Sequence, residues 1–267
     1  MTRSISLPMY DFPEVLTSST ALLEALSVAF TALGEDAQPS FPESSEHEHL
    51  MTMWKDDDTL LSQSCGLPFV EELHDYVDVI ATLKWTGISD DRGWYRTVIV
   101  VRESSDVATL SEAGGLQPVI TNTQSLSGWC SLGVALSEVT TDPQFVQPYV
   151  ESGGHAKSLQ MLQDKKADLA SIDPGTFQLL SRHRPTLTRG LRVIGLGPLV
   201  PATPLHVSKI RNVSLDQARE AVLAVLSRPE LAGARVEIGI DGVVPMSSED
   251  YSVIAPLIER AHAVLPR

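Results

Sequence analysis

The order of apolar and polar positions predicts strands that alternate with helices along most of the chain. Short apolar runs rich in β-branched residues predict strands, most clearly the run YRTVIVV at Tyr95–Val101. Between about residues 14 and 33, Leu22, Leu26 and Phe30 recur at helical spacing and predict an amphipathic helix. This alternation of strands and helices predicts an α/β protein with parallel sheets.

The same reading extends to the rest of the chain. Further strands are predicted at residues 4–9, 59–64, 76–83, 119–121, 167–172, 191–196 and 205–208. Further helices are predicted after residue 128, at 155–164, from Pro174, at 215–226 and at 251–264. The acidic, Pro- and Ser-rich segment 35–48 is predicted to be a surface loop, and its His47-Glu48-His49 sequence is more typical of solvated residues than of a metal site.

Composition indicates a soluble globular protein with an ample core. The 267 residues are 43% hydrophobic, which fits one large domain or two lobes of ordinary size. The formal net charge of −14 argues against a nucleic-acid partner. A site for an anion would therefore have to use short-range hydrogen-bond donors.

Cysteine usage and the N-terminus bear on the compartment. Cys65 and Cys130 cannot form a disulfide framework for a chain of this length, and we interpret them as small, mostly buried side chains. The first residues lack the apolar core and cleavage site of a signal peptide, and no run of 18 apolar residues was found. We therefore expect a cytoplasmic protein without membrane insertion, and a periplasmic one only if a leader has been removed.

Seven segments, in this order, carry a resemblance to a known family: SLPMYD, LLSQSCGLP, GWYRTVIVVR, NTQSLSG, SGGHAKSL, KADLASID and LRVIGLG. Together they span residues 6 to about 204, and the succession resembles the phosphate/phosphonate-binding proteins of ABC transporters. The resemblance implies the type 2 periplasmic-binding-protein fold, with two α/β lobes and a ligand cleft between them. It places lobe one at residues 1–95 and 195–267, and lobe two at 96–194. It also implies binding of a small anion without chemical change.

Two helix starts in the second lobe are candidate anion sites. The first contains Ser125, Ser127 and Gly128, and the second runs from Ser152 to His155. The first N–H groups of a helix have no partner within it, and its dipole favours an anion there. These serines could equally act only as helix caps, and His155 could be an ordinary surface or capping histidine.

The resemblance adds Tyr10, Gln63 and Ser64 from lobe one and Tyr95 near the first crossing between lobes. Tyr95 could alternatively be a core residue, because it borders a strongly apolar strand. Asp173 ends a predicted strand and either contacts an amine or hydroxyl of the ligand or caps the helix that starts at Pro174. The tryptophans that either line the cleft or belong to the core are Trp85, Trp94 and Trp129.

Other functions stay open at this point. The chain lacks a G-x-S-x-G elbow, a paired-carboxylate motif, metal-ligand spacing and a complete nucleotide-binding glycine motif. No catalytic residue, metal or cofactor is therefore predicted, although an enzyme using His155 or Cys65, or a cytosolic ligand sensor, is an alternative on the same scaffold. The expected partners are a small-molecule anion and a transporter permease or regulatory protein.

Overall fold

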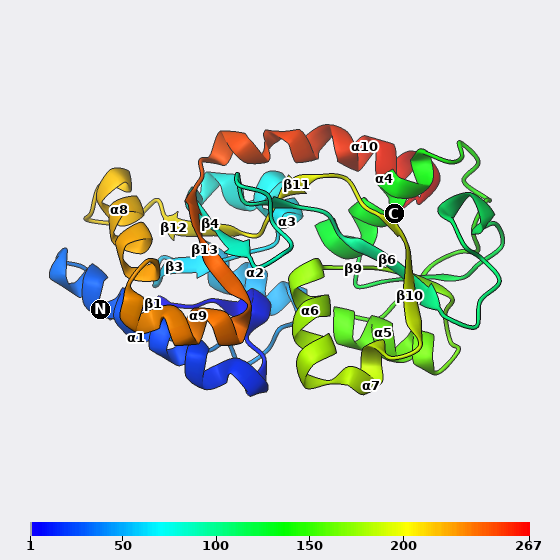
Figure 1. Ribbon diagram of the computed structural model, residues 1–267. Helices are drawn as coiled ribbons and strands as arrows, with labels where there is room; N and C mark the ends of the chain where they lie inside the picture. Colours follow the sequence, from blue (N-terminus) through cyan, green and yellow to red (C-terminus); the bar gives the residue numbers. More distant parts are fainter. Residues whose placement is uncertain (1) are drawn as a thin grey trace. The chain divides into compact units, whose positions relative to one another are not determined.

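A computed structural model describes residues 2–267 of the chain. The chain forms two compact units, each built on its own β-sheet (Figure 1). Unit 1 ends at Trp94 and resumes over Pro201–Ser252, whereas unit 2 comprises Tyr95–Val200 and Val253–Arg267. A separate two-stranded pair joins β5 (Trp94–Tyr95) and β11 (Val200–Pro201).

The six-stranded sheet of unit 1 has the order β13-β4-β12-β3-β1-β2. Its strands are β1 (Arg3–Ile5), β2 (Ala37–Pro39), β3 (Thr59–Gln63), β4 (Val77–Trp85), β12 (Pro204–Ser208) and β13 (Ile240–Pro245). Strand β1 is parallel to β2 and β3, but β12 is antiparallel to β3 and β4, and β13 is antiparallel to β4. The prediction of parallel sheets therefore holds for β1, β2 and β3 but is wrong for β12 and β13. Strand β12 enters the sheet when the chain returns from unit 2, without the helical crossover that parallel neighbours need.

Unit 1 holds five α-helices among the described residues: α1 (Leu16–Ala32), α2 (His47–Lys55), α3 (Gly66–Glu71), α8 (Leu215–Leu226) and α9 (Ala232–Ile238). Short 3₁₀ turns accompany them: η1 (Pro8–Tyr10), η2 (Pro13–Val15), η3 (Leu73–Asp75) and η6 (Pro229–Leu231). A further 3₁₀ segment, η7 (Ser248–Ile254), begins in unit 1 and ends in unit 2. The apolar face of α1 is buried at Leu22, Leu26 and Phe30, as its spacing predicts. Burial of side chains of this size stabilises the fold by about 1.5–3 kcal/mol each.

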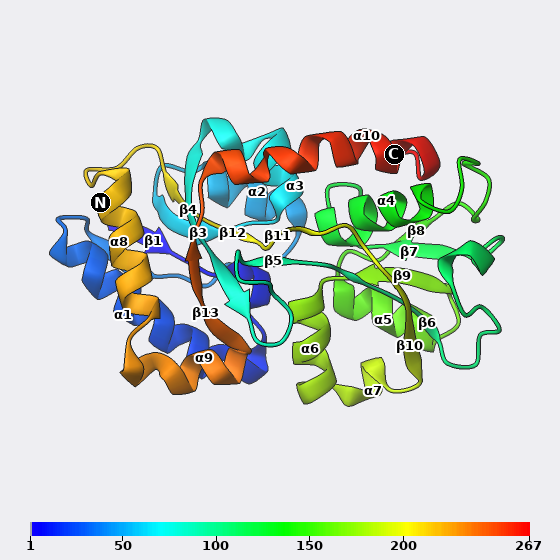
Figure 2. The same ribbon diagram turned by 45° about the horizontal axis from the view of Figure 1, so that its top comes forward.

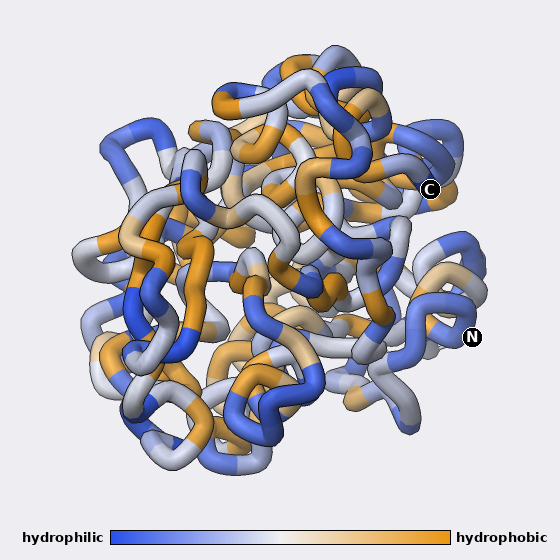
Figure 3. The backbone as a smooth tube through the Cα atoms, turned by 90° about the vertical axis from the view of Figure 1, so that its right-hand side faces the viewer, coloured by the Kyte–Doolittle hydropathy of each residue, from blue (hydrophilic) through white to orange (hydrophobic). Residues whose placement is uncertain are grey.

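Helix α1 is also long and apolar enough to cross a membrane, by length and composition, when counted over Pro13–Ala32. In the structure it packs against β2, α8 and α9, which accounts for its apolar face within unit 1 (Figure 2). Figure 3 shows that hydrophobic and hydrophilic stretches alternate along most of the chain, within helices as well as loops.

Two parts of unit 1 were not predicted correctly. The segment 35–48 is not entirely loop, because it contains β2 and the start of α2, where Leu50, Met51 and Trp54 are buried. The charged and Pro-rich composition of this segment is typical of loops, so neither β2 nor the start of α2 was predicted. Helix α9 and strand β13 had no prediction, since both are short and α9 carries only one buried residue, Ile238.

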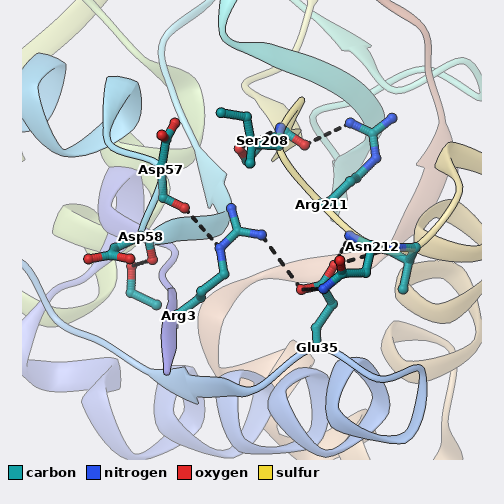
Figure 4. Close-up of polar contacts among 10 residues, drawn as sticks. Arg3, Glu35, Asp57, Asp58, Ser208, Arg211 and Asn212 are labelled. Carbon is teal, nitrogen blue, oxygen red and sulfur yellow. Dashed lines mark hydrogen bonds and ion pairs between the residues drawn. The ribbon is translucent and has the colours of Figure 1, made fainter. Parts of the chain in front are cut away.

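A buried carboxylate ties distant segments of unit 1 together (Figure 4). Glu35 is 2% exposed, and its Oε1 accepts hydrogen bonds from the backbone N–H groups of Asn212 at 2.5 Å and Val213 at 3.3 Å. Its Oε2 lies 3.6 Å from Nη1 of Arg3, whose Nε donates to the carbonyl of Asp57. The pair and its added hydrogen bonds fix the segment before α8 against β1.

Unit 2 has a five-stranded sheet in the order β10-β6-β9-β7-β8. Its strands are β6 (Val98–Arg102), β7 (Pro118–Ile120), β8 (Val150–Glu151), β9 (Leu169–Ile172) and β10 (Leu191–Leu196). Its helical elements are η4 (Leu110–Glu112), η5 (Leu126–Cys130), α4 (Ser131–Ser137), α5 (His155–Gln163), α6 (Pro174–His183), α7 (Pro185–Thr188) and α10 (Ala255–Val264). Strands β7, β8 and β9 are mutually parallel, whereas β6 is antiparallel to β9 and β10.

The C-terminal segment differs from the expected lobes. Residues 195–267 were expected in lobe one, but Val253–Arg267 group with unit 2. Helix α10 packs against α4, and Trp129 Nε1 donates a hydrogen bond of 2.9 Å to the carbonyl of Leu265. The sequence pattern predicted this helix but gave no indication of its packing partner.

Candidate functional site

Polar residues of unit 2 follow the carboxyl ends of three parallel strands. Thr121 comes directly after β7, Ser152 after β8 and Asp173 after β9. Because β6 runs antiparallel to β9 and pairs Val98 with Ile172, the preceding Tyr95 reaches the same edge. This is the edge at which open α/β sheets usually bind ligands.

The first predicted helix start lies at this edge. Leu126–Cys130 form one π-helical turn that continues directly into α4. Ser125 is its N-cap, and its Oγ accepts a hydrogen bond of 2.9 Å from the N–H of Gly128. A Cβ at Gly128 would lie 2.4 Å from Thr121 Oγ1 and 2.9 Å from Thr121 N, so only glycine allows β7 and this turn to approach so closely.

The second helix start contributes His155, which is partly exposed. Its Nε2 lies 2.7 Å from Ser127 Oγ and accepts a hydrogen bond of 3.4 Å from the backbone N–H of Asp173. Loss of hydration lowers the pKa of His155 to about 4, while the charge of Asp173 opposes this shift. The imidazole is therefore neutral at physiological pH and brings together residues that follow β7, β8 and β9.

Both carboxylate oxygens of Asp173 contact protein groups. Oδ1 accepts the backbone N–H of Thr176 at 2.8 Å, which makes Asp173 the N-cap of α6. Oδ2 accepts the hydroxyl of Tyr95 at 2.9 Å, and both residues are at most 5% exposed. Of the two predicted roles for Asp173, the capping role is present, and Tyr95 is buried with a polar partner at the site edge.

Ser152 also makes local contacts. Its hydroxyl lies 3.1 Å from the carbonyl oxygens of Ile120 and Gly154 and 2.7 Å from Ser158 Oγ. The N-cap of α5 is Gly154, which provides no side-chain cap. The first turn of α5 is therefore left without a capping side chain beside the Ser127–His155 pair.

Buried polar atoms without a partner gather near this edge. Among residues 2–267, Thr121 Oγ1, Ser131 Oγ and His155 Nδ1 have no hydrogen-bond partner. Thr121 is 6% exposed and Ser131 is fully buried. A buried polar group without a partner is costly, so each of these atoms is a place where a polar ligand or a water could supply the missing bond.

Thr97 and Ser171 add a further buried polar pair. Their hydroxyl oxygens are 2.9 Å apart, and a Cβ at Gly197 would lie 2.2 Å from Thr97 Oγ1. None of Thr97, Thr121, Ser131 and Ser171 was predicted as a site residue. Thr97 and Thr121 directly adjoin strand ends, and that position is a signal that could have identified them, whereas Ser171 lies within β9.

The residues predicted from lobe one lie together in unit 1. Gln63 ends β3, and Tyr10 follows the neighbouring parallel strand β1 through η1. Gln63 Nε2 donates to Thr203 Oγ1 at 2.8 Å, whereas Gln63 Oε1 and Ser64 Oγ have no partner among the described residues. Tyr10 packs against Trp85, with ring centroids 4.2 Å apart. Their role in binding stays a prediction.

The three tryptophans that were predicted to lie in the cleft or the core differ in burial. Trp85 and Trp129 are fully buried core residues, each within its own unit. Trp94 is only partly buried, and the Arg92 guanidinium lies 4.7 Å from its ring centroid. The core alternative therefore holds for Trp85 and Trp129.

Sequence comparison assigns the family. Residues 8–251 match the family described as the periplasmic substrate-binding protein of phosphonate ABC transporters. The chain belongs to this family. No curated protein sequence matches it.

Several solved structures share the fold. A phosphonate-transporter binding protein from Pseudomonas aeruginosa is 16% identical, with a TM-score of 0.74 over 97% of this chain and 87% of that one. PhnD1 from Prochlorococcus marinus, solved with methylphosphonate, is 14% identical, with a TM-score of 0.78 over 98% and 99% of the two chains. The alkanesulfonate-binding protein SsuA from Xanthomonas axonopodis, solved with MOPS, is 15% identical, with a TM-score of 0.61 over 100% and 94%. The predicted two-lobed periplasmic-binding-protein fold and family are confirmed.

Proposed function

We propose that the chain binds a small phosphorus oxyanion, of the phosphonate or phosphate type, at the strand-end edge of unit 2. The observation that carries this proposal is the convergence of the helix start at Ser125–Gly128, the Ser127–His155 pair and the partnerless Thr121 Oγ1. Helix N–H groups and hydroxyls suit an oxyanion, and family membership supports phosphorus as its central atom.

The charge pattern also favours binding through neutral donors. The chain carries a net charge of −14, and within the described part of the chain the hydrogen-bond partners of the Ser127 and His155 side chains are Ser125, the Asp173 backbone and each other, with no lysine or arginine. Long-range attraction would thus contribute little to affinity. Most of the binding affinity must therefore come from short hydrogen bonds to buried donors.

Catalysis is the second candidate, because Ser127 Oγ and His155 Nε2 are at the distance of a nucleophile and its general base. Two features weigh against it. The Asp173 carboxylate bonds Tyr95 and Thr176 rather than His155 Nδ1, so no acid within residues 2–267 orients the imidazole. A histidine with a pKa of about 4 is also a weak base at neutral pH.

Family membership points to an ABC transporter, so we infer that the protein partner is the transporter's permease. The family is described as periplasmic, whereas the N-terminal sequence led us to expect a cytoplasmic protein. The compartment and a regulatory partner both stay predictions.

Thermal unfolding with a ligand panel tests the proposed function. The panel contains phosphate, methylphosphonate, a phosphate monoester, sulfate and acetate. A ligand at a hundredfold its Kd stabilises the folded state by about 2.7 kcal/mol, so one phosphorus oxyanion should raise the Tm by several degrees. A Tm that no phosphorus oxyanion changes at millimolar concentration would contradict the proposal.

A further inference from the structure

The hydrogen bonds around His155 define which ring nitrogen carries its proton. A backbone N–H can only donate, and that of Asp173 points to Nε2 at 3.4 Å. This contact, although long, favours Nε2 as the acceptor. Because a neutral imidazole has one N–H group, the proton lies on Nδ1.

This tautomer determines the orientation of the Ser127 hydroxyl. Ser127 Oγ lies 2.7 Å from Nε2, and an accepting nitrogen requires the hydroxyl to donate. Ser127 therefore has only lone pairs left for a ligand. Ser125 Oγ, 3.5 Å from Ser127 Oγ, already accepts the N–H of Gly128, so its own proton is available to Ser127 or to a ligand.

The charged groups near the Ser127–His155 pair decide which ligand oxygen atoms it can accept. The Asp173 carboxylate is the charged group that acts on His155, and the Tyr95 hydroxyl donates to that carboxylate. The nearby cation Lys157 is exposed on α5. Its Nζ lies beside Gly153, 3.8 Å from the position that a Cβ of residue 153 would take. An oxygen atom without a proton would face the Ser127 lone pairs with a carboxylate close by, which is unfavourable.

We propose that the site selects oxyanions that carry an O–H group, an inference that rests on the proposed function. Ser127 Oγ accepts the hydrogen bond from that O–H group. The ligand class is then the singly protonated phosphonate or phosphate. Sulfate, sulfonates and fully ionised phosphonates, which offer only acceptors, are excluded. The selection depends on the proton and not on net charge.

Calorimetric titrations with methylphosphonate and methanesulfonate from pH 6 to pH 9 test this. Methanesulfonate has the shape and charge of the methylphosphonate monoanion but no O–H group. The affinity for methylphosphonate should fall about tenfold for each pH unit above the ligand's second pKa, because the monoanion becomes scarcer. At pH 6, methanesulfonate should bind at least a hundredfold more weakly.

Substitution of Ser127 provides the second arm. Alanine neither accepts a hydrogen bond nor repels an oxygen atom, so Ser127→Ala should reduce the preference for methylphosphonate over methanesulfonate at least tenfold. Ser104→Ala, at an exposed position of unit 2, should leave that preference unchanged. This ratio is independent of any general loss of affinity in the variant.

The outcomes are distinguishable. Binding of methylphosphonate with a constant Kd from pH 6 to pH 9, or of methanesulfonate within threefold of it at pH 6, would overturn the inference and leave the proposed function intact. Absence of binding at every pH by both methylphosphonate and inorganic phosphate would overturn the proposed function, and this inference with it.

Discussion

At the scale of single residues, His206 is a histidine buried in the core of unit 1. It lies in the middle of β12, is 1% exposed, and its Nε2 has no hydrogen-bond partner among the described residues. Burial lowers the pKa of His206 to about 3. The imidazole must therefore stay neutral in the folded protein.

We predict that His206 makes folding sensitive to acid. Its pKa in the unfolded chain is about 6.5, so between pH 6.5 and about 3 the unfolded state binds more protons and stability falls as the pH falls. At pH 5 the loss should be about 2 kcal/mol relative to pH 7. Urea unfolding at both pH values should show a smaller loss for His206→Leu than for the wild type. The exposed control His262→Gln should behave as the wild type, and equal losses in all three proteins would contradict the prediction.

Sequence motifs predicted several residues that the structure brings together. Ser125, Ser127, His155 and Asp173 were predicted, and all lie at one edge of the unit 2 sheet. Their capping signals are local and therefore readable from the sequence. Thr121 was not predicted, because its relevance depends on β7 lying against Gly128, which no local pattern encodes.

At the scale of elements, the contact between α4 and α10 depends on one small residue. A Cβ at Gly133 would lie 2.8 Å from both Cα and Cβ of Ala261, and 2.9 Å from its carbonyl oxygen. Backbone atoms cannot move aside easily, so a larger residue must push the helices apart.

Gly133→Ala should therefore destabilise the protein by about 1–3 kcal/mol, measured by chemical denaturation. Adding Ala261→Gly removes the clash with its Cβ, whereas the clashes with its Cα and carbonyl oxygen remain. The double variant should therefore recover part of the lost stability and be more stable than the sum of the single effects predicts. Gly233→Ala, in α9 with no atom within 4 Å of the new Cβ, is the control and should be neutral or slightly stabilising. Strictly additive effects would show that the two helices do not constrain one another here.

Most elements with strong local periodicity were predicted, whereas pairing between strands was not. Helix α8 begins with the predicted capping box of Ser214 and Gln217, and β3 and β10 lie where the apolar runs placed them. The antiparallel direction of β12 depends on segments distant in the sequence. For the same reason, the packing of α10 in unit 2 could not be predicted from its own residues.

At the scale of the whole molecule, the chain is a two-unit member of the phosphonate-binding family. The ordered series of seven segments was sufficient to predict the family, although each segment alone is unspecific. Solved relatives at 14–16% identity support the fold, and the chemistry of binding rests on the residues of this chain.

The most direct test of the account is a calorimetric titration of methylphosphonate at pH 6 into the wild type, Ser127→Ala and His155→Gln. The account predicts saturable one-to-one binding to the wild type and at least a tenfold higher Kd for each variant, because each loses a hydrogen bond at the site. The exposed controls Ser104→Ala and His262→Gln should keep the wild-type Kd. Wild-type affinity in both site variants would contradict the account and place the ligand elsewhere on the protein.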